Sequence, residues 1–246
     1  MSIVRARNYG RLGNVLFQVG CSASYALEHN LDLAVQTQTN DPFWNPLYLQ
    51  HLKNDNWVDG KEIILINENS FRYEKLEFRE EWRGKQIELN GYFQSWKFLE
   101  DYRHEILYLF NFQYEKKENY VSIHVRRGDY LMLKDKHIVP TVEWYEQAMA
   151  MFPNAKFKFF SDEIKWCKDN FSHRTDCEFS TNTNELDDLI EASQCEHNIN
   201  SSSSFSFWIS WLNRNPNKIC IFPKLWFVEG YHLNTEDLLH PNWIKL

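Results

Sequence analysis

Glycine, proline and cysteine are all scarce in this sequence. The 246 residues include 8 glycines, 7 prolines and 5 cysteines, which excludes collagen-like and low-complexity chains. With 43% hydrophobic residues, the composition is typical of an ordered globular protein, long enough for one large or two small domains. The cysteines are scattered, odd in number and without any Cys-x-x-Cys or Cys/His metal spacing. That pattern excludes a zinc site and a disulfide framework, and it favours a reducing compartment.

Long apolar runs and an excess of positive charge are also absent. No stretch reaches the about 18 apolar residues of a membrane-spanning helix, and the first residues lack the apolar core of a signal peptide. Lys and Arg number 27 against 34 Asp and Glu, for a net charge of −7, so the basic surface of a nucleic-acid binder is excluded. We therefore expect a cytoplasmic protein, soluble or peripherally associated with a membrane, with no transmembrane segment and no nucleic-acid partner.

A third absence concerns metals. The sequence contains no Asp-x-Asp pair of the kind that holds a divalent cation against a nucleotide-sugar diphosphate. It also contains no His and carboxylate cluster at metal spacing. We therefore expect no metal cofactor. If a diphosphate leaves during a reaction here, arginines and helix amides must balance its charge.

The first half of the chain begins with the pattern of a strand, a turn and a helix. A short apolar strand at 3–4 and a glycine-containing turn precede apolar residues that recur at three- and four-residue intervals from Leu12 to Leu27. This stripe predicts a helix with one buried face. The remaining predicted elements of this half are strands at 62–66 and 86–93, a helix around 98–110, and loops or short helices over 42–57 and 71–82.

The second half alternates regularly between strands and helices. This alternation predicts βαβ units and a parallel, doubly wound sheet, so the fold class is α/β. The polar stretch 113–119 separates the halves, and we predict domains at 1–115 and 116–246. The predicted strands of the second half are 120–125, 156–160, 177–180, 197–200 and 218–222, and the helices between them are 141–152, 163–170, 185–194 and 204–213.

The stretch SIHVRRGDY, residues 122–130, places two adjacent arginines at the end of a predicted strand. Because side chains alternate along a strand, His124 and Arg126 should point the same way, into the crevice where open α/β sheets bind ligands. A guanidinium group there suits a phosphate anion, and Arg127 could pair with Asp129 to hold the loop. The alternative interpretations are a surface salt-bridge cluster and an adhesion tripeptide at 127–129, for which a cytosolic protein has no use.

Four serines at 201–204 follow a predicted strand and precede an amphipathic helix. Serines at that place supply N-cap oxygens, hydroxyl donors and backbone amides at the positive end of a helix dipole, which suits a phosphate. Alone, such serines are ordinarily only caps. Together with Arg126 they give two anion-binding elements at the ends of two strands, and this pairing suits a diphosphate.

Several motifs in a fixed order resemble the alpha-1,2-fucosyltransferase family. They extend over nearly the whole chain: GRLGN at 10–14, GYFQSWKF at 91–98, SIHVRRGDY at 122–130, FFSDE at 159–163, DLIEASQCEHNINSSSSFSFWISWL at 188–212 and FPKLWF at 222–227. The resemblance implies a GT-B type glycosyltransferase with two Rossmann-like domains and a cleft between them. It implies a metal-independent, inverting transfer of fucose from GDP-fucose, bound mainly by the C-terminal domain, to O2 of galactose in a glycan acceptor.

The resemblance also implies roles for individual residues. Arg126 would engage the donor diphosphate and forms, with Asn14 and Asp129, the implied catalytic set. Gln94 and Ser95 belong to the signature on the acceptor side. The implied donor-binding residues are His124, Arg126, Arg127, Arg11, Gly13, Ser203, Ser204, Phe205 and Asp162.

Some positions depart from the family pattern. Arg11 stands where the family usually has a second glycine, as in the related protein O-fucosyltransferases, and Val15 replaces a glutamine. Ser202, Phe207 and Ile209 replace an asparagine, a tryptophan and a glycine. The donor-phosphate residues are kept, whereas the N-terminal changes leave the acceptor and the linkage open.

The sequence leaves two alternative functions and the general base open. The scaffold could use another GDP-sugar or a protein acceptor, and the 10 tryptophans are also compatible with a non-catalytic carbohydrate-binding protein. Inverting transfer usually uses a general base near the attacking hydroxyl. Asp129, Asp135, His137 and Asp162 are available, and none has a spacing that singles it out.

Overall fold

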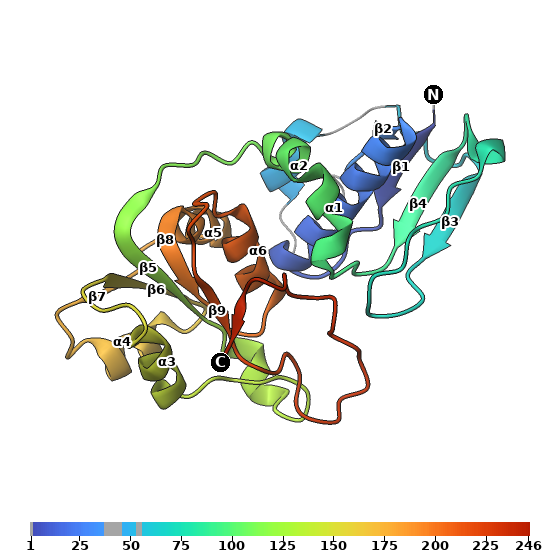
Figure 1. Ribbon diagram of the computed structural model, residues 1–246. Helices are drawn as coiled ribbons and strands as arrows, with labels where there is room; N and C mark the ends of the chain where they lie inside the picture. Colours follow the sequence, from blue (N-terminus) through green and yellow to red (C-terminus); the bar gives the residue numbers. More distant parts are fainter. Residues whose placement is uncertain (1, 37–45, 53–55) are drawn as a thin grey trace. The chain divides into compact units, whose positions relative to one another are not determined.

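The protein forms two compact α/β units. The computed structural model describes residues 2–36, 46–52 and 56–246 (Figure 1). Unit 1 comprises Met1–Phe112 and Leu233–His240, and unit 2 comprises Gln113–His232 and Pro241–Leu246. The first division therefore falls between 112 and 113, where the sequence suggested 115 and 116. Segment Leu233–His240 packs with unit 1 instead of the C-terminal domain to which the sequence assigned it.

Unit 1 is built on a parallel sheet. Its strands lie in the order β2-β1-β4-β3, and the pairings are parallel. Val4, Ile87 and Leu89 of the sheet pack with Cys21 and Tyr25 of α1 in one core, as the predicted helix stripe requires. The elements of this unit are β1 (Ile3–Ala6), α1 (Leu12–His29), β2 (Asp32–Leu33), η1 (Pro46–Leu52), β3 (Ile63–Asn67), η2 (Glu80–Trp82), β4 (Gln86–Asn90), η3 (Trp96–Phe98), η4 (Glu100–Tyr102) and α2 (Arg103–Phe110).

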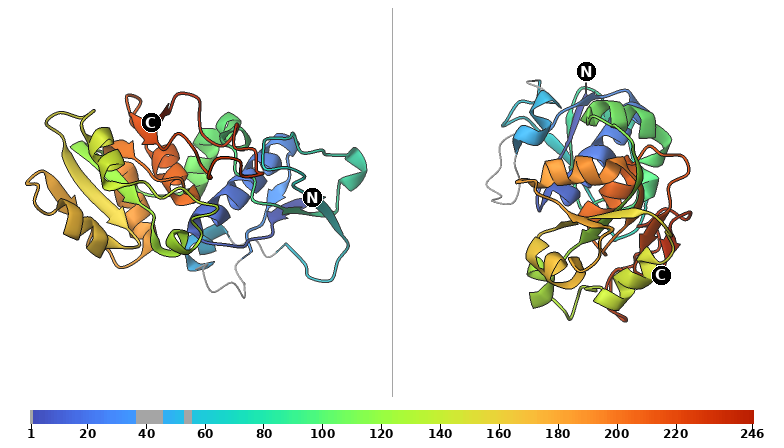
Figure 2. Two further views of the ribbon diagram at one scale, coloured as in Figure 1. Left: turned by 90° about the horizontal axis from the view of Figure 1, so that it is seen from below. Right: turned by 90° about the vertical axis from the view of Figure 1, so that its left-hand side faces the viewer.

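Unit 2 is a doubly wound sheet with strands in the order β10-β9-β8-β5-β6-β7, and its pairings are parallel. Val121, Ile123 and Val125 of β5 pack with residues of α3 and α4, while α5 and α6 cover the opposite face (Figure 1 and Figure 2). The elements of this unit are β5 (Lys117–Val125), η5 (Gly128–Met132), α3 (Val142–Met149), β6 (Lys156–Ser161), α4 (Ile164–Phe171), β7 (Cys177–Phe179), α5 (Glu185–Gln194), β8 (Cys195–Ile199), α6 (Ser204–Leu212), β9 (Cys220–Phe222) and β10 (Ile244–Lys245).

Each sheet contains a point where the direction of winding reverses. In unit 2 the chain passes from β5 to β6 and β7 on one side, then crosses back through β8 to β9 on the other. In unit 1 the corresponding reversal lies between β1 and β4. Open α/β sheets bind ligands at such a switch point, outside the carboxyl ends of the strands. The motifs singled out in the sequence follow these four strands.

The predicted parallel α/β architecture is confirmed, and the differences concern the ends of elements. β4 ends at Asn90, because the chain turns directly afterwards and Phe93 adopts a φ of 52°. The predicted helix at 98–110 is α-helical only from Arg103. The strands β2 and β10 were not predicted, since a two-residue strand carries no periodic pattern.

The two aromatic stretches of unit 1 contain little regular α-helix or strand where they are described. The first, 42–57, lies partly outside the described residues, and its part within Pro46–Leu52 is a 3-10 segment. The second, 71–82, is irregular up to the 3-10 turn Glu80–Trp82. Among the helices in the described ranges, none combines the length and the apolar character needed to cross a bilayer.

Candidate active site

His124 lies at the end of β5 and packs against the serine turn that follows β8. β5 and β8 are parallel neighbours, so their carboxyl ends meet at one edge of the sheet. Nδ1 of His124 lies 2.6 Å from Oγ of Ser206 and 3.2 Å from Oγ of Ser201. The centroids of the His124 and Phe205 rings are 4.8 Å apart. The structure therefore brings together the two elements that the sequence predicted at neighbouring strand ends.

Burial keeps His124 uncharged. The residue is 6% exposed, and burial, assisted by the nearby charge of Arg126, lowers its pKa to about 3. A neutral imidazole supplies no positive charge to an anionic ligand. Positive charge at this edge of the sheet must therefore come from the arginines.

We expect the stability of the protein to fall as the pH is lowered from neutrality, in part because of His124. An unfolded histidine takes up a proton near pH 6.5, whereas folded His124 does so only near pH 3. Between these values the unfolded state binds more protons, so each unit of decreasing pH lowers the free energy of unfolding by about 1.4 kcal/mol. Urea unfolding of the wild type and of His124→Gln between roughly pH 5 and 7 measures this difference in slope. Equal slopes for the two proteins would contradict the assignment.

Arg126 directly follows β5 and is held by two carboxylates. Its Nη2 donates to Oδ1 of Asp129, and its Nη1 lies 2.8 Å from Oδ2 of Asp162. The guanidinium carbon lies 5.2 Å from the centroid of the Tyr130 ring, and the side chain is 13% exposed. Since a guanidinium group has five N–H donors in one plane, the two carboxylates fix its orientation and leave donor capacity for an anion.

Arg127 has other partners than the predicted one. Its Nε donates to Oε2 of Glu163 at 3.1 Å, and its guanidinium carbon lies 4.2 Å from the centroid of the Trp166 ring in α4. The predicted pairing of Arg127 with Asp129 is wrong, because Asp129 pairs with Arg126. Consecutive residues of an extended chain point to opposite sides, which explains why the second arginine reaches α4.

Asp162 connects the loop that carries Arg126 and Arg127, called the arginine loop, to the end of β6. Its Oδ1 accepts the backbone N–H of Arg127 at 3.0 Å, while its Oδ2 binds Arg126. Gly128 lies so close that a β-carbon at this position would overlap Oδ2 of Asp162. Glycine at 128 thus leaves room for the carboxylate that orients both arginines.

The serine turn is held in place largely by its own hydroxyl groups. Ser203 caps α6 by accepting the N–H of Ser206 at 3.2 Å. The hydroxyl of Ser202 donates to the carbonyl of Leu225 at 2.9 Å. These hydroxyl groups, which the sequence suggested as donors to a phosphate, are engaged inside the protein. What the turn presents is therefore chiefly the N-terminus of α6.

Ser204 and Phe205 are the first two residues of α6 and are partly exposed. The first amides of a helix have no acceptor within it, and they carry the positive end of its dipole. Together with Arg126, this helix start places guanidinium and backbone N–H donors at the edge of the sheet formed by β5 and β8. The predicted convergence of an arginine and a helix N-terminus thus has a physical basis in the pairing of β5 with β8.

The sequence did not predict that a stack of aromatic rings lies beside the arginine loop. The centroids of the Tyr130 and His137 rings are 3.9 Å apart, and the His137 ring lies 5.4 Å from that of Phe227. An antiparallel bridge joins His137 and Phe227, and Val228 N–H donates to the carbonyl of Lys136 at 3.0 Å. Burial lowers the pKa of His137 to about 4, which makes it a weak base.

The glycine-rich turn of unit 1 lies at the β1 and β4 switch point. Gly10 has a φ of +83°, and a β-carbon there would lie 2.6 Å from Nδ2 of Asn14, so this position requires glycine. Arg11 is exposed and precedes α1, whose first turn contains the buried Gly13. Oδ1 of Asn14 accepts a hydrogen bond from Nε2 of Gln94 at 2.8 Å. This bond joins the GRLGN and GYFQS motifs.

Metal-binding and redox groups contribute little to this picture. Over residues 2–36, 46–52 and 56–246, no three His, Cys, Asp or Glu side chains are grouped to hold a metal ion. The five cysteines lie in these ranges as free thiols. Burial raises the pKa of Cys167 and of Cys195 to about 12, so both thiols stay protonated at neutral pH.

Sequence and structure comparisons place this chain among glycosyltransferases. The model of the family "Glycosyl transferase family 11" matches residues 110–246. The chain is 27% identical to the alpha-1,2-colitosyltransferase of Escherichia coli, over 100% of this chain and 99% of that protein. It is 30% identical to galactoside alpha-(1,2)-fucosyltransferase 2 of Bos taurus, over 52% of this chain and 46% of that protein. Among solved structures, POFUT1 in complex with GDP is similar in fold, with a TM-score of 0.51 and 11% identity over 90% of this chain and 97% of that chain.

The paired parallel α/β units are those of a glycosyltransferase of the GT-B type, which confirms the predicted fold class. The family match covers more than half of the chain, and the chain belongs to glycosyl transferase family 11. The expected relationship to the alpha-1,2-fucosyltransferases is confirmed with it.

Proposed function

We propose that this family 11 glycosyltransferase moves L-fucose from GDP-fucose to O2 of a galactose unit in a glycan acceptor. The observation that supports this proposal most directly is the edge formed by β5 and β8. There, Arg126 is oriented by Asp129 and Asp162 beside the element that starts α6. A fixed guanidinium and a helix N-terminus are the groups that bind and neutralise a diphosphate.

The proposed reaction is a single in-line displacement with inversion. The acceptor oxygen forms a bond to the anomeric carbon of fucose while the bond from that carbon to the β-phosphate oxygen breaks. Both bonding electrons leave with GDP. Arg126 and the first amides of α6 offset the negative charge that develops on the diphosphate, so the reaction needs no metal cation. A cytoplasmic location remains the prediction from the free cysteines.

The proton of the attacking hydroxyl passes, in this proposal, to the departing diphosphate. Asp129 and Asp162 both bind the guanidinium group of Arg126, and orienting that group is the role assigned to them here. His137 is a weak base with a pKa of about 4, and Asp135 is exposed. None of the four candidates from the sequence is therefore assigned as general base.

Binding of GDP without metal is expected to stabilise the protein against heat. At a GDP concentration about 100 times its Kd, the free energy of unfolding rises by about 2.7 kcal/mol, which raises the Tm by roughly 5–10 °C. Thermal unfolding with GDP and EDTA measures this effect, and UDP is the matched control. A non-catalytic carbohydrate-binding protein would ignore GDP.

The transfer itself is tested by incubation with GDP-fucose and a panel of galactosides, followed by product mass and linkage analysis. We expect one added deoxyhexose at O2 of galactose. If GDP binds and no galactoside gains fucose, the donor site stands and the acceptor assignment fails.

A second donor, GDP-colitose, is supported by one observation. The E. coli alpha-1,2-colitosyltransferase aligns over the full length of this chain, whereas the bovine fucosyltransferase aligns over about half of it. A competition assay with equal concentrations of both GDP-sugars separates the two donors by the mass of the product.

A further inference from the structure

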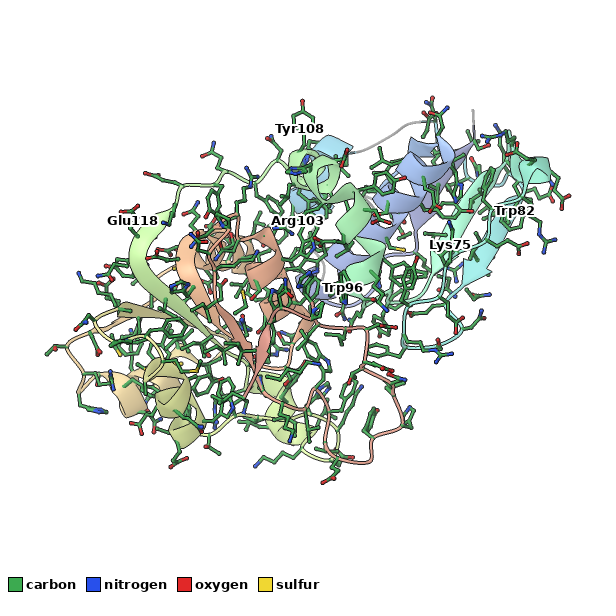
Figure 3. All side chains as sticks on the ribbon, viewed as in Figure 1. Lys75, Trp82, Trp96, Arg103, Tyr108 and Glu118 are labelled. Atoms are coloured by element: carbon green, nitrogen blue, oxygen red, sulfur yellow. The ribbon has the colours of Figure 1, made fainter. Side chains whose placement is uncertain are left out.

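Unit 1 contains a cavity of about 370 Å³ that no residue of the proposed donor site lines. It lies where β3 ends, along the chain that follows this strand, and Lys75 and Trp82 of its lining are labelled in Figure 3. The end of β3 belongs to the carboxyl edge of the parallel sheet, the edge at which such sheets bind ligands. The volume falls within the range of small-molecule sites, about 300–1,000 Å³.

The apolar part of the lining is aromatic. Trp82 and Phe98 are partly exposed rings of the lining and pack against the core of unit 1, whereas Phe93 is fully buried in that core. Rings that are fixed by a core lose little conformational entropy when a ligand packs on them. Their apolar faces suit the C–H face of a sugar ring.

The polar part of the lining offers hydrogen-bonding groups that the protein itself does not use. Among the described residues, the side-chain amide of Asn69 has no hydrogen-bond partner, and Arg72 makes an ion pair with Glu74 at 3.8 Å. Asn67 accepts a hydrogen bond from Asn90 at 2.8 Å through Oδ1, and its own N–H groups are left over. The lining therefore contains both donors and acceptors, and a hydroxyl group can bond to either.

The charges around the cavity favour an uncharged ligand. Three carboxylates and two cations line the cavity, namely Glu68, Glu74, Glu77, Arg72 and Lys75. Glu68 accepts two backbone N–H groups, and each of the other four has an ion-pair partner. A phosphate would meet too many carboxylates, and a cation would meet Arg72. The balance suits a polyhydroxylated neutral molecule.

The cavity is connected to the switch point of unit 1 through Glu68. Its two carboxylate oxygens accept the backbone N–H groups of Tyr92 and Phe93 at 2.7 and 3.0 Å. The next residue, Gln94, donates to Asn14. A ligand in the cavity that moves Glu68 would therefore also move the backbone of the GYFQS loop and, through Gln94, the side chain of Asn14.

From this geometry we infer that the cavity is a binding site for a neutral saccharide, a sugar unit of the acceptor glycan next to the galactose that is modified. The acceptor role rests on the proposed function, whereas saccharide binding does not. Asn69 and Arg72 supply hydrogen bonds to the sugar hydroxyl groups, and Trp82 supplies the ring face. The site would select acceptors by the sugar that precedes or follows the reacting galactose.

The test uses the double variant Asn69→Ala/Arg72→Ala in the full chain. Both side chains are exposed at the surface of the cavity, so the fold is expected to persist, and an unchanged Tm and GDP-induced shift check this. Lys61→Ala is the matched control, because Lys61 lies just before β3 in the same unit, is exposed and does not line the cavity. We expect the double variant to raise the acceptor KM at least tenfold with little change in kcat, and the control to match the wild type.

Direct binding separates this inference from the proposed function. Saturation-transfer NMR with lactose and N-acetyllactosamine, without any nucleotide, should show sugar contacts that the double variant loses and Lys61→Ala keeps. If the wild type transfers no fucose but loses sugar binding in the double variant, the transferase proposal fails and the saccharide site stands. If the double variant binds and reacts like the wild type, the saccharide site is wrong, whatever the reaction.

Discussion

Replacing Arg126 with alanine or with lysine is expected to lower the turnover of fucose transfer by about 10²- to 10³-fold. A fixed charge that stabilises a developing anion contributes about 3–4 kcal/mol to the transition state, and Arg126 is the arginine that two carboxylates orient at the β5 and β8 edge. Lysine keeps the charge but cannot span Asp129 and Asp162 in one plane, so it should fail nearly as badly as alanine. Initial rates of GDP release at saturating acceptor measure the effect.

Arg174→Ala is the matched control for Arg126. Arg174 belongs to the same unit and also makes a two-bond ion pair, with Asp176, at the other end of the sheet where β7 begins. Its loss should leave turnover within about twofold, because partly exposed ion pairs contribute little to stability. Substantial activity in both Arg126 variants, with folding intact, would show that the diphosphate is bound elsewhere.

Gly128→Ala is expected to lower kcat/KM by about 10²-fold without unfolding the protein. The new β-carbon would displace the carboxylate of Asp162, which holds Arg126 and the N–H of Arg127. A misplacement of about 1 Å in a group that touches the reacting atoms can reduce the rate by this factor. Steady-state kinetics with GDP-fucose give the value.

A double-mutant cycle distinguishes this mechanism from general damage to the loop. If Gly128→Ala acts by pushing Asp162 aside, it should cost little more in an Asp162→Ala background, where nothing remains to be pushed. Independent, multiplying losses would mean that the glycine serves another purpose. Thermal unfolding of the wild type, the two single variants and the double variant checks that a loss of activity does not come from a loss of folded protein.

The sequence predicted the fold well because its strongest signals are local. Alternating strands and helices identified the parallel sheet of unit 2, and the stripe from Leu12 to Leu27 identified α1. The prediction failed where the decisive contact is distant in sequence. Segment Leu233–His240 packs with unit 1. One of its contacts is the hydrogen bond that Ser95 Oγ donates to the carbonyl of Asp237 at 2.7 Å. The periodicity of a sequence does not show that a late segment returns to an earlier domain.

The site was predictable in its residue types but not in its pairings. The motif SIHVRRGDY pointed to His124 and Arg126, and strand alternation gave their common side. Alternation also implied that Arg127 would point away, but it did not show which arginine Asp129 would reach, and Asp129 pairs with Arg126. The role of Gly128 depends on how near β6 brings Asp162, which is a tertiary contact without a sequence signal.

The strand order of unit 2 has a consequence for how the enzyme acquires its activity during folding. β5 pairs with β6 through one local crossover, but its pairing with β8 requires the intervening β6, β7 and their helices to be bypassed. Contacts between distant segments close larger loops and slow folding. The edge that carries Arg126 and the start of α6 is therefore assembled by the most distant strand pairing that β5 makes. A nascent or partly unfolded chain can thus hold much of its local structure and still lack the edge that would bind the donor.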